Sequence, residues 1–236
     1  MLKITSLALL LTATVSCLPF SIKPQANAPD MTALITSLRN AITGADRETI
    51  LIGQGPKAFI FDFANPPNNT ILTFPGGMSV QAEEKTFPPL SGVSMSITST
   101  ILNACAIRQP HTHPRAGEFN VVIEGTITTQ YKAEEGTDFV VSELPTFSST
   151  FFPKGSIHGA INPSCNRAVL LTIFDTNDSG LTNSAPNFFA FNDKIVQGVL
   201  GGQKVLSEEE LATIRADVGN VGYDQGCLTQ CGITTK

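Results

Sequence analysis

Short apolar runs broken by turn residues fill the middle of the chain, and this pattern constrains the fold more than any other feature. Between Phe59 and Phe174, the runs are rich in Val, Ile, Thr and Phe, as in GVSMSITSTIL, FNVVIEGTITTQY, DFVVSEL and AVLLTIF. Such residues favour strands, and the Gly, Pro and Asn between the runs favour turns. The alternating FIFDF is expected to be a further strand. Many short strands with frequent turns predict an all-β sandwich or barrel.

The composition agrees with a folded protein that binds neither nucleic acid nor membrane. Of the 236 residues, 42% are hydrophobic and 15% are charged, which allows a sizeable core. The formal net charge of −5 argues against a nucleic-acid partner, because that role normally needs a basic face. The chain contains no run of about 18 apolar residues, the length that a membrane-spanning helix needs.

Helix signals flank the β-rich region. Asp30 to Thr43 is expected to be helical, with one apolar face formed by Leu34, Ile35, Leu38 and Ile42. Near the other end, FNDKIVQGVLG and SEEELATIRAD favour helices, and Ser207 with Glu210 forms a capping box. We therefore expect an N-terminal helical arm over residues 29–58, a barrel domain over 59–205 and a helical tail over 206–236.

The N-terminus has the features of a secretory signal peptide. Lys3 supplies a positive charge, and the run from Ile4 to Val15 is apolar but too short to span a bilayer. Cleavage is expected near Cys17, which gives a signal over residues 1–17, or after Ala28. A buried N-terminal helix is the alternative. The signal predicts a secreted protein, located outside the cell or in the cell wall.

The cysteines and sequons fit an exported protein. Removal of the signal leaves an even number of cysteines, which permits two disulfides: Cys105, Cys165, Cys227 and Cys231. Cys227 and Cys231 are close enough in sequence to close a small loop, and free buried thiols are the alternative. Two sequons make Asn68 and Asn177 candidate glycosylation sites.

The three histidines of the chain fall into one pattern with a glutamate. His111 and His113 lie two residues apart, so both project from one face of a strand. The turn-like segment 114–117 resets the register, so Glu118 can point to the same side. His158 begins another β-run, which a closed barrel can bring opposite the pair. Three neutral imidazoles and one carboxylate suit a transition metal. Mn²⁺ fits, Fe, Ni and Zn are also compatible, and an octahedral ion would keep two positions open.

The residues around this cluster resemble the two sequence motifs of the germin-like cupins. In the first motif, G-x5-H-x-H-x3,4-E-x6-G, the chain keeps the histidines, the glutamate and Gly125, but Cys105 replaces the leading glycine. In the second, G-x5-P-x-G-x2-H-x3-N, it keeps Pro153, Gly155, His158 and Asn162, but Phe147 replaces the leading glycine. The resemblance covers about residues 59 to 205, and the layout is similar to the secreted spherulin type of microbes.

This resemblance implies a cupin jelly-roll β-barrel in which the three histidines and the glutamate hold manganese. It also implies C-terminal helices that pack against neighbouring subunits in a homo-oligomer, a trimer or a hexamer. Phe119, Val121 and Ile123 alternate with Val122, so this strand is apolar on both faces, and either a second sheet or another subunit covers its outer face. The geometry of the family places Cys105 near Cys165, which predicts a disulfide between them.

The reaction is less constrained than the metal site. The resemblance implies a manganese oxidoreductase that acts on superoxide or on a small carboxylate such as oxalate. The alternatives are a non-catalytic, spherulin-like wall or matrix protein with a stabilising metal, and a cupin that binds a carbohydrate or another small ligand. The lack of Trp, with only two Tyr, disfavours the carbohydrate role.

Residues near the predicted ligands depart from the family pattern. Oxalate oxidases of the family place an asparagine three residues before the first histidine of the motif. Arg108 stands at that position here, and Asn103 is the nearest asparagine upstream. Arg108 either attracts an anion or is a plain surface residue. Arg115 is expected to fix its loop through hydrogen bonds, and Asn162 is expected to be structural.

Overall fold

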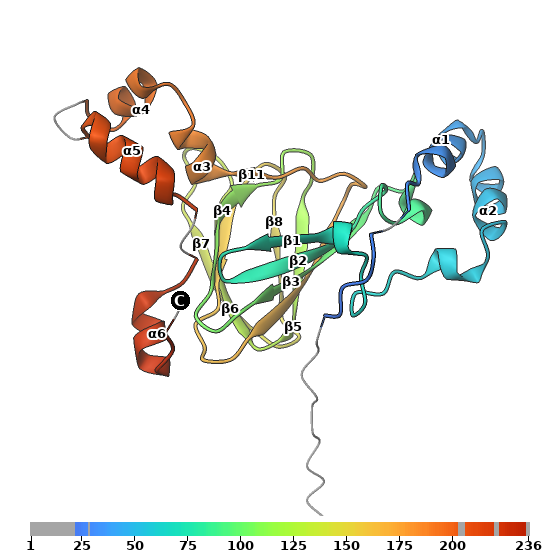
Figure 1. Ribbon diagram of the computed structural model, residues 1–236, viewed down its shortest axis with the longest axis horizontal. Helices are drawn as coiled ribbons and strands as arrows, with labels where there is room; N and C mark the ends of the chain where they lie inside the picture. Colours follow the sequence, from blue (N-terminus) through green and yellow to red (C-terminus); the bar gives the residue numbers. More distant parts are fainter. Residues whose placement is uncertain (1–21, 28, 203–205, 220–221, 235–236) are drawn as a thin grey trace, which may run out of the picture.

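Two antiparallel β-sheets pack face to face and form a barrel at the centre of the molecule (Figure 1). The computed structural model describes residues 22–27, 29–202, 206–219 and 222–234. The predicted signal run from Ile4 to Val15 and Cys17 lie outside these residues. Among these residues, the strands form the central barrel and the helices lie toward the two ends of the chain. This arrangement confirms the predicted all-β class with helical ends.

The strand order follows from long-range antiparallel pairing. One sheet has the order β1 (Ile71–Phe74), β2 (Gly77–Ala82), β3 (Ser96–Leu102), β10 (Ala168–Phe174), β5 (Glu118–Glu124) and β8 (Ser149–Phe152). The other has the order β11 (Thr182–Asn183), β4 (Ile107–Thr112), β9 (Ile157–Ile161), β6 (Thr126–Lys132) and β7 (Val140–Pro145). Every pairing between neighbouring strands is antiparallel.

The predicted break at Gly125 separates β5 from β6. Gly125 has a φ of +80°, and a Cβ there would lie 3.0 Å from the Cβ of Ala168. Glycine alone meets both demands without strain. The chain therefore leaves one sheet at this residue and enters the other.

One predicted strand is wrong. FIFDF forms no strand: Phe59 ends the 3-10 helix η1 (Pro56–Phe59), and the following residues are irregular. The ring centroids of Phe61 and Phe63 lie 4.8 Å apart, and Phe61 also contacts Phe87. These aromatic side chains pack with each other instead of pairing in a sheet. Of two further 3-10 helices, η2 (Asn68–Thr70) directly precedes β1, and η3 (Pro88–Leu90) lies between β2 and β3.

The hydrophobic core occupies one end of the barrel. It contains residues from both sheets, among them Leu102, Val122, Ile127 and Leu170. Along β5 the inward positions are Glu118, Asn120 and Val122, of which the last packs into this core. The polar positions of the same face therefore lie toward the other end of the barrel, where the histidines are found.

The N-terminal arm consists of two helices, α1 (Thr32–Asn40) and α2 (Gly44–Ile52), which extend from one side of the barrel (Figure 1). The predicted single helix stops at Asn40, and Ile42 lies between the two helices with 93% of its surface exposed. A capping box formed by Thr43 and Asp46 starts α2. The box appears in the sequence as T-x-x-D and marks the start of α2. The apolar periodicity alone did not reveal that the helix ends before this point.

A second arm extends from the opposite side of the barrel (Figure 1). It comprises α3 (Ser184–Phe189), α4 (Asp193–Val199) and α5 (Glu208–Asp217). Val196, Leu206 and Leu211 form its small core, and the predicted capping box of Ser207 and Glu210 is present. No helix among the described residues has the length and apolar character needed to cross a membrane.

Two disulfide bonds attach the last helix, α6 (Gln225–Cys231), to the barrel. The disulfides are Cys105–Cys227 and Cys165–Cys231, so the predicted Cys105–Cys165 bond and the Cys227–Cys231 loop are both wrong. The expected proximity is real, because the Cys105 amide donates to the Ser164 carbonyl at 3.0 Å. However, residues four apart lie on one face of a helix. Cys227 and Cys231 of α6 therefore both face the barrel, and each bonds to a different one of Cys105 and Cys165.

Candidate metal centre

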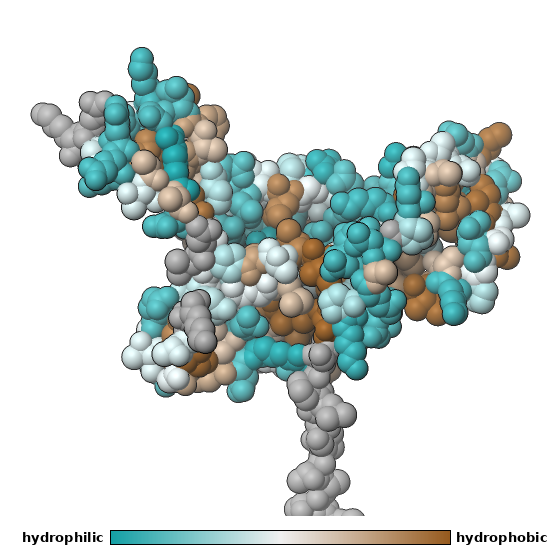
Figure 2. All heavy atoms as spheres, viewed as in Figure 1, coloured by the Kyte–Doolittle hydropathy of each residue, from teal (hydrophilic) through white to brown (hydrophobic). Residues whose placement is uncertain are grey.

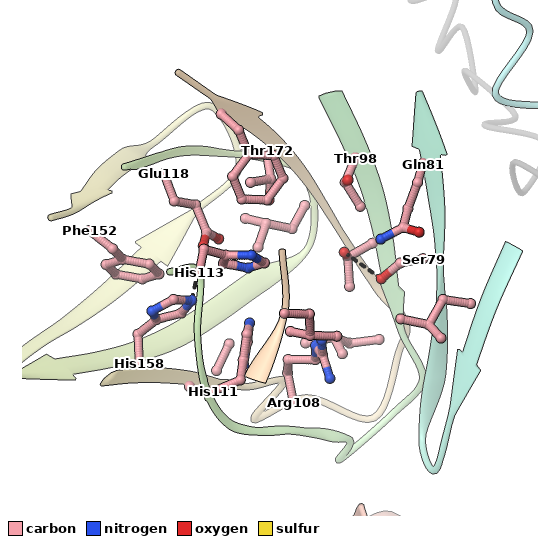
Figure 3. A pocket seen from close by; sticks show the side chains of 18 residues that line it. Ser79, Gln81, Thr98, Arg108, His111, His113, Glu118, Phe152, His158 and Thr172 are labelled. Atoms are coloured by element: carbon pink, nitrogen blue, oxygen red, sulfur yellow. Dashed lines mark hydrogen bonds and ion pairs between the residues drawn. The ribbon is translucent and has the colours of Figure 1, made fainter. Parts of the chain in front are cut away.

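Three histidines and one glutamate meet inside the barrel, as the sequence predicts (Figure 3). His111 is in β4, His113 follows its end, Glu118 begins β5 and His158 is in β9. The candidate ligand atoms all lie within 4.8 Å of one another. All four residues are buried, with at most 8% of their surface exposed.

Strand register brings these side chains together. His111 pairs directly with His158 across β4 and β9. The turn after His113 resets the register before Glu118, as expected. Its backbone is fixed by bonds from the Gly117 amide to the Asp175 carboxylate and from the Arg115 amide to the Ser179 carbonyl. The Arg115 guanidinium also donates to Asp178, which confirms its predicted role in holding the loop.

Backbone carbonyls orient the three imidazole rings. His111 Nδ1 faces the Gln109 carbonyl at 2.8 Å, and His158 Nδ1 faces the Ser156 carbonyl at 3.0 Å. His113 Nδ1 faces the Gly180 carbonyl. A carbonyl only accepts hydrogen bonds, so each Nδ1 carries the proton and each Nε2 of a neutral ring presents a lone pair. Aromatic contacts with Phe152 and Phe174 further restrict His158 and His113.

The electrostatics favour the protonation states that a metal ion needs. Burial lowers the pKa of His111 well below its ordinary value, and it also lowers the pKa of His113. Burial alone would raise the pKa of Glu118, but the adjacent His158 and His113 outweigh it and leave this pKa lowered. At neutral pH the site thus has neutral imidazoles at positions 111 and 113 and a charged carboxylate.

The facing lone pairs indicate that a cation belongs at this point. Glu118 Oε2 lies 2.9 Å from His158 Nε2 and 3.4 Å from His113 Nε2. Both Glu118 Oε2 and His158 Nε2 are buried without a hydrogen-bond partner. Buried acceptors in such contact are unfavourable unless a positive charge lies among them. A divalent transition metal satisfies all four donors at once.

A cavity of about 40 Å³ opens beside the four side chains. Arg108 lines it together with polar residues of the six-stranded sheet, including Ser79, Gln81, Thr98 and Thr100 (Figure 3). The polar lining was not predicted from the sequence. Alternation in β2 and β3 contained the signal, because Ser79 and Gln81, like Thr98 and Thr100, lie two residues apart and face one side.

Two other sequence-predicted residues do not reach the cavity. Asn103 is exposed in the turn after β3. Asn162 is completely buried, and its amide donates to the carbonyls of Leu102, Asn103 and Asn166. Neither residue lines the cavity, and the expected structural role of Asn162 agrees with its contacts.

Comparisons with known proteins point to one family. Residues 61–210 match the family model described as Cupin. Spherulin-1A of Physarum polycephalum is 30% identical over 201 residues, which are 85% of this chain and 80% of that protein. Germin-like protein 1-2 of Oryza sativa subsp. japonica is 29% identical over 143 residues, which are 60% of this chain and 62% of that protein.

Solved structures share the fold. Oxalate oxidase in complex with the substrate analogue glycolate superposes with a TM-score of 0.54 at 19% identity, covering 61% of this chain and 73% of that one. Oxalate decarboxylase from Bacillus subtilis at pH 4.6 gives a TM-score of 0.57 at 17% identity, covering 65% and 39%. The barrel, the buried cluster and these relatives lead to one conclusion: the chain belongs to the cupin family and is a germin-like, spherulin-like member of it.

Proposed function

We propose that this protein is a secreted, manganese-binding oxidoreductase that acts on a small carboxylate or on superoxide. The observation that carries the proposal is the set of inward-facing lone pairs of His111, His113, Glu118 and His158, placed beside a small cavity with a mixed polar and apolar lining. Four protein ligands leave two positions of an octahedral ion open. When bound, manganese would supply Lewis acidity and electron transfer at those positions.

The residues of the chain would perform the remaining tasks. The backbone carbonyls behind each imidazole hold the ring planes and tautomers, and the buried carboxylate of Glu118 balances charge. Phe152 and Phe174 cover two of the rings and exclude water from that side. Oxalate oxidase and oxalate decarboxylase share the fold, which favours a small carboxylate as substrate.

A non-catalytic structural role with a stabilising metal is the second candidate. The match to Spherulin-1A spans more of the chain than the match to the germin-like protein, and the cavity is small. This candidate differs from the first in one measurable respect: the metal would bind without turnover.

Secretion and oligomerisation belong to the same proposal. Two disulfides favour an oxidising compartment. Figure 2 shows apolar side chains on the surface of the barrel between the arms, and on the arm formed by α1 and α2. The large exposed apolar residues include Phe119, Ile123 and Phe151 of the outer sheet face. A homo-oligomer, trimeric or hexameric, would cover such surfaces.

Metal content and activity, measured on the same samples, test the function. Elemental analysis of the purified protein should give about one manganese per chain, and His113→Ala should lose it. Asn103→Ala, which changes an exposed residue away from the cavity, is the matched control. Hydrogen peroxide release from oxalate and superoxide decay are then assayed. Metal without either activity would favour the structural role, and wild-type protein without metal would refute the site.

A further inference from the structure

Of the three histidine rings, only that of His113 is oriented by a distant segment. The carbonyls that face the other two rings each lie two residues before their own histidine. The carbonyl that faces His113 belongs to Gly180, 67 residues further along the chain. A contact within two residues follows from the local strand, whereas this one exists only while the two segments lie together. The direction of the His113 lone pair therefore depends on tertiary structure.

Residues 175–181 join β10 to β11, and this joining segment is bonded to the loop that carries His113. Asp175 accepts a hydrogen bond from the loop at 2.9 Å, and Asp178 pairs with an arginine of the loop at 2.6 Å. Leu181, at the end of the joining segment, lines the cavity beside the four candidate ligands. A displacement of the joining segment would therefore move the carbonyl behind His113 and one wall of the cavity together.

Glu84 bonds to the middle of the joining segment. The side-chain amide of Asn177 donates to Glu84 Oε2 at 3.2 Å, and the backbone amide of Glu84 donates to the Asn177 carbonyl at 3.4 Å. Glu84 lies in the turn after β2 and is only 6% exposed. Its carboxylate also accepts from the guanidinium of Arg39 in α1, with an Nε–Oε1 distance of 2.8 Å. Contacts thus run from the N-terminal arm through Glu84 and Asn177 to the segment behind His113.

The charge of Arg39 keeps the buried Glu84 carboxylate in place. In the described part of the chain, Glu84 forms one ion pair, and its partner is Arg39. The hydrogen bond from Arg39 lowers the pKa of Glu84, whereas burial acts in the opposite direction. A buried carboxylate that loses its cation turns toward water or takes up a proton, and either response weakens the bond from Asn177. The Arg39 side chain itself is 65% exposed, so its removal leaves no cavity in the core.

We propose that Arg39 and Glu84 are positioning residues for the metal ligand His113, and that they act through Asn177 and the joining segment. Neither Arg39 nor Glu84 lines the cavity, so neither contacts the metal or a substrate. The arm formed by α1 and α2 would thus support the metal centre, and its docking on the barrel would be coupled to metal affinity. The inference rests on the metal binding of the proposed function, but not on the reaction.

Manganese affinity, measured by competition with a chelator, tests this coupling. Arg39→Ala should weaken Mn²⁺ binding by about two- to thirtyfold, the range for residues that act on a site through others. Arg39→Lys keeps the charge but not the planar fork, and should be intermediate. Arg215→Ala removes a comparable ion pair, with Asp193 at 2.6 Å, from the other arm and should leave the affinity unchanged. Arg39→Ala/Asn177→Ala should bind no more weakly than the weaker single variant, because both residues act along one path.

The imidazole protons give a second measurement that needs no metal. In ¹⁵N-labelled, metal-free protein, the exchange rate of each Nδ1 proton with water reports the hydrogen bond to its carbonyl. Arg39→Ala should speed exchange at His113 by about twofold or more. The His158 proton faces a carbonyl of its own strand region and should exchange as in wild type. A general loss of stability would instead speed exchange at both rings.

Both changes are expected together in protein that binds manganese, and either one without the other would overturn the proposal. An equal loss of affinity in Arg39→Ala and Arg215→Ala would overturn it as well. If Arg39→Ala does not fold, Asn177→Ala decides, because it removes the next contact of the same path. Wild-type protein without manganese would refute the proposed function, whereas faster exchange at His113 alone would still support the positioning role. Arg39-dependent metal binding without turnover would support the positioning role and refute the oxidoreductase.

Discussion

Cys105 and Phe147 share a left-handed backbone conformation, with φ of +58° and +64°. Both occupy positions at which the germin-like motifs have glycine. The chain has therefore lost the glycines but kept the backbone that they permit. Cys105 is completely buried and held by its disulfide and by hydrogen bonds to both sides. Phe147 is 85% exposed and donates one backbone bond to Val122.

Replacing Phe147 with glycine should stabilise the protein. The side chain contributes little packing at 85% exposure, and a positive φ costs a non-glycine residue about 1 kcal/mol or more. Part of this gain is offset by the greater freedom of glycine in the unfolded chain. We expect Phe147→Gly to raise the free energy of unfolding by roughly 0.5–1 kcal/mol in urea denaturation. Phe147→Ala keeps the strained Cβ and should show no such gain; equal effects of the two variants would contradict the argument.

The two disulfides should open in a fixed order. Cys165 is exposed, whereas Cys105 and Cys227 are buried, so a dithiol reductant should attack the Cys165–Cys231 bond first. The released Cys231 thiolate would lie near Cys105 Sγ, 3.7 Å away in the oxidised protein, and it can displace Cys227 from the buried bond. Alkylation and peptide mass mapping during partial reduction should therefore detect a Cys105–Cys231 link with Cys165 and Cys227 labelled.

A variant without the exposed bond provides the control for this order. In Cys165→Ser/Cys231→Ser, the described part of the chain keeps no free thiol that could attack the buried Cys105–Cys227 bond. We expect its reduction to slow by about tenfold or more relative to wild type, since access limits exchange. Equal rates, or labelling of Cys105 before Cys165, would show that the buried bond is attacked directly.

Acid should destabilise the metal-free protein. The pKa values of His111 and His113 are lowered by burial, whereas unfolded histidines take up protons near pH 6.5. Below that pH the unfolded state binds more protons than the folded state, so the free energy of unfolding falls as pH falls. The lowered pKa of Glu118 acts in the same direction, since its contribution is present above the unfolded pKa and lost at lower pH.

Urea unfolding of metal-free protein at several pH values between 7.5 and 4.5 measures this effect. His111 and His113 each contribute a slope of up to about 1.4 kcal/mol per pH unit. His111→Gln should reduce the slope between pH 6.5 and 5.5 by up to that amount. An unchanged stability over this interval in wild type would mean that the histidines take up protons in the folded state as readily as in the unfolded chain.

The sequence predicted the strands and the ligands better than the connections between them. Short runs of β-branched and aromatic residues, bounded by turn residues, marked β3, β5, β6, β7 and β10. Residue spacing identified the four candidate ligands, because each lies close to a turn that fixes its direction. The disulfide pairing could not be predicted, because it depends on where α6 docks. The place of Arg108 in the cavity depends on a bulge that only strand pairing reveals.

The two sequons should differ in occupancy when the chain is produced in a eukaryotic secretory host. Asn68 is exposed at the start of η2. The Asn177 amide instead donates to Glu84 Oε2 at 3.2 Å, and Asn177 is only partly exposed. Glu84 also binds Arg39 of α1. A glycan on Asn177 would disturb the contact that ties α1 to the barrel.

Peptide mapping after enzymatic deglycosylation should thus find conversion at Asn68 alone. Asn68→Gln should abolish the mass shift, whereas Asn177→Gln should retain it and lose about 1 kcal/mol of stability. Conversion at Asn177 would show that this contact with Glu84 does not form in the secreted protein.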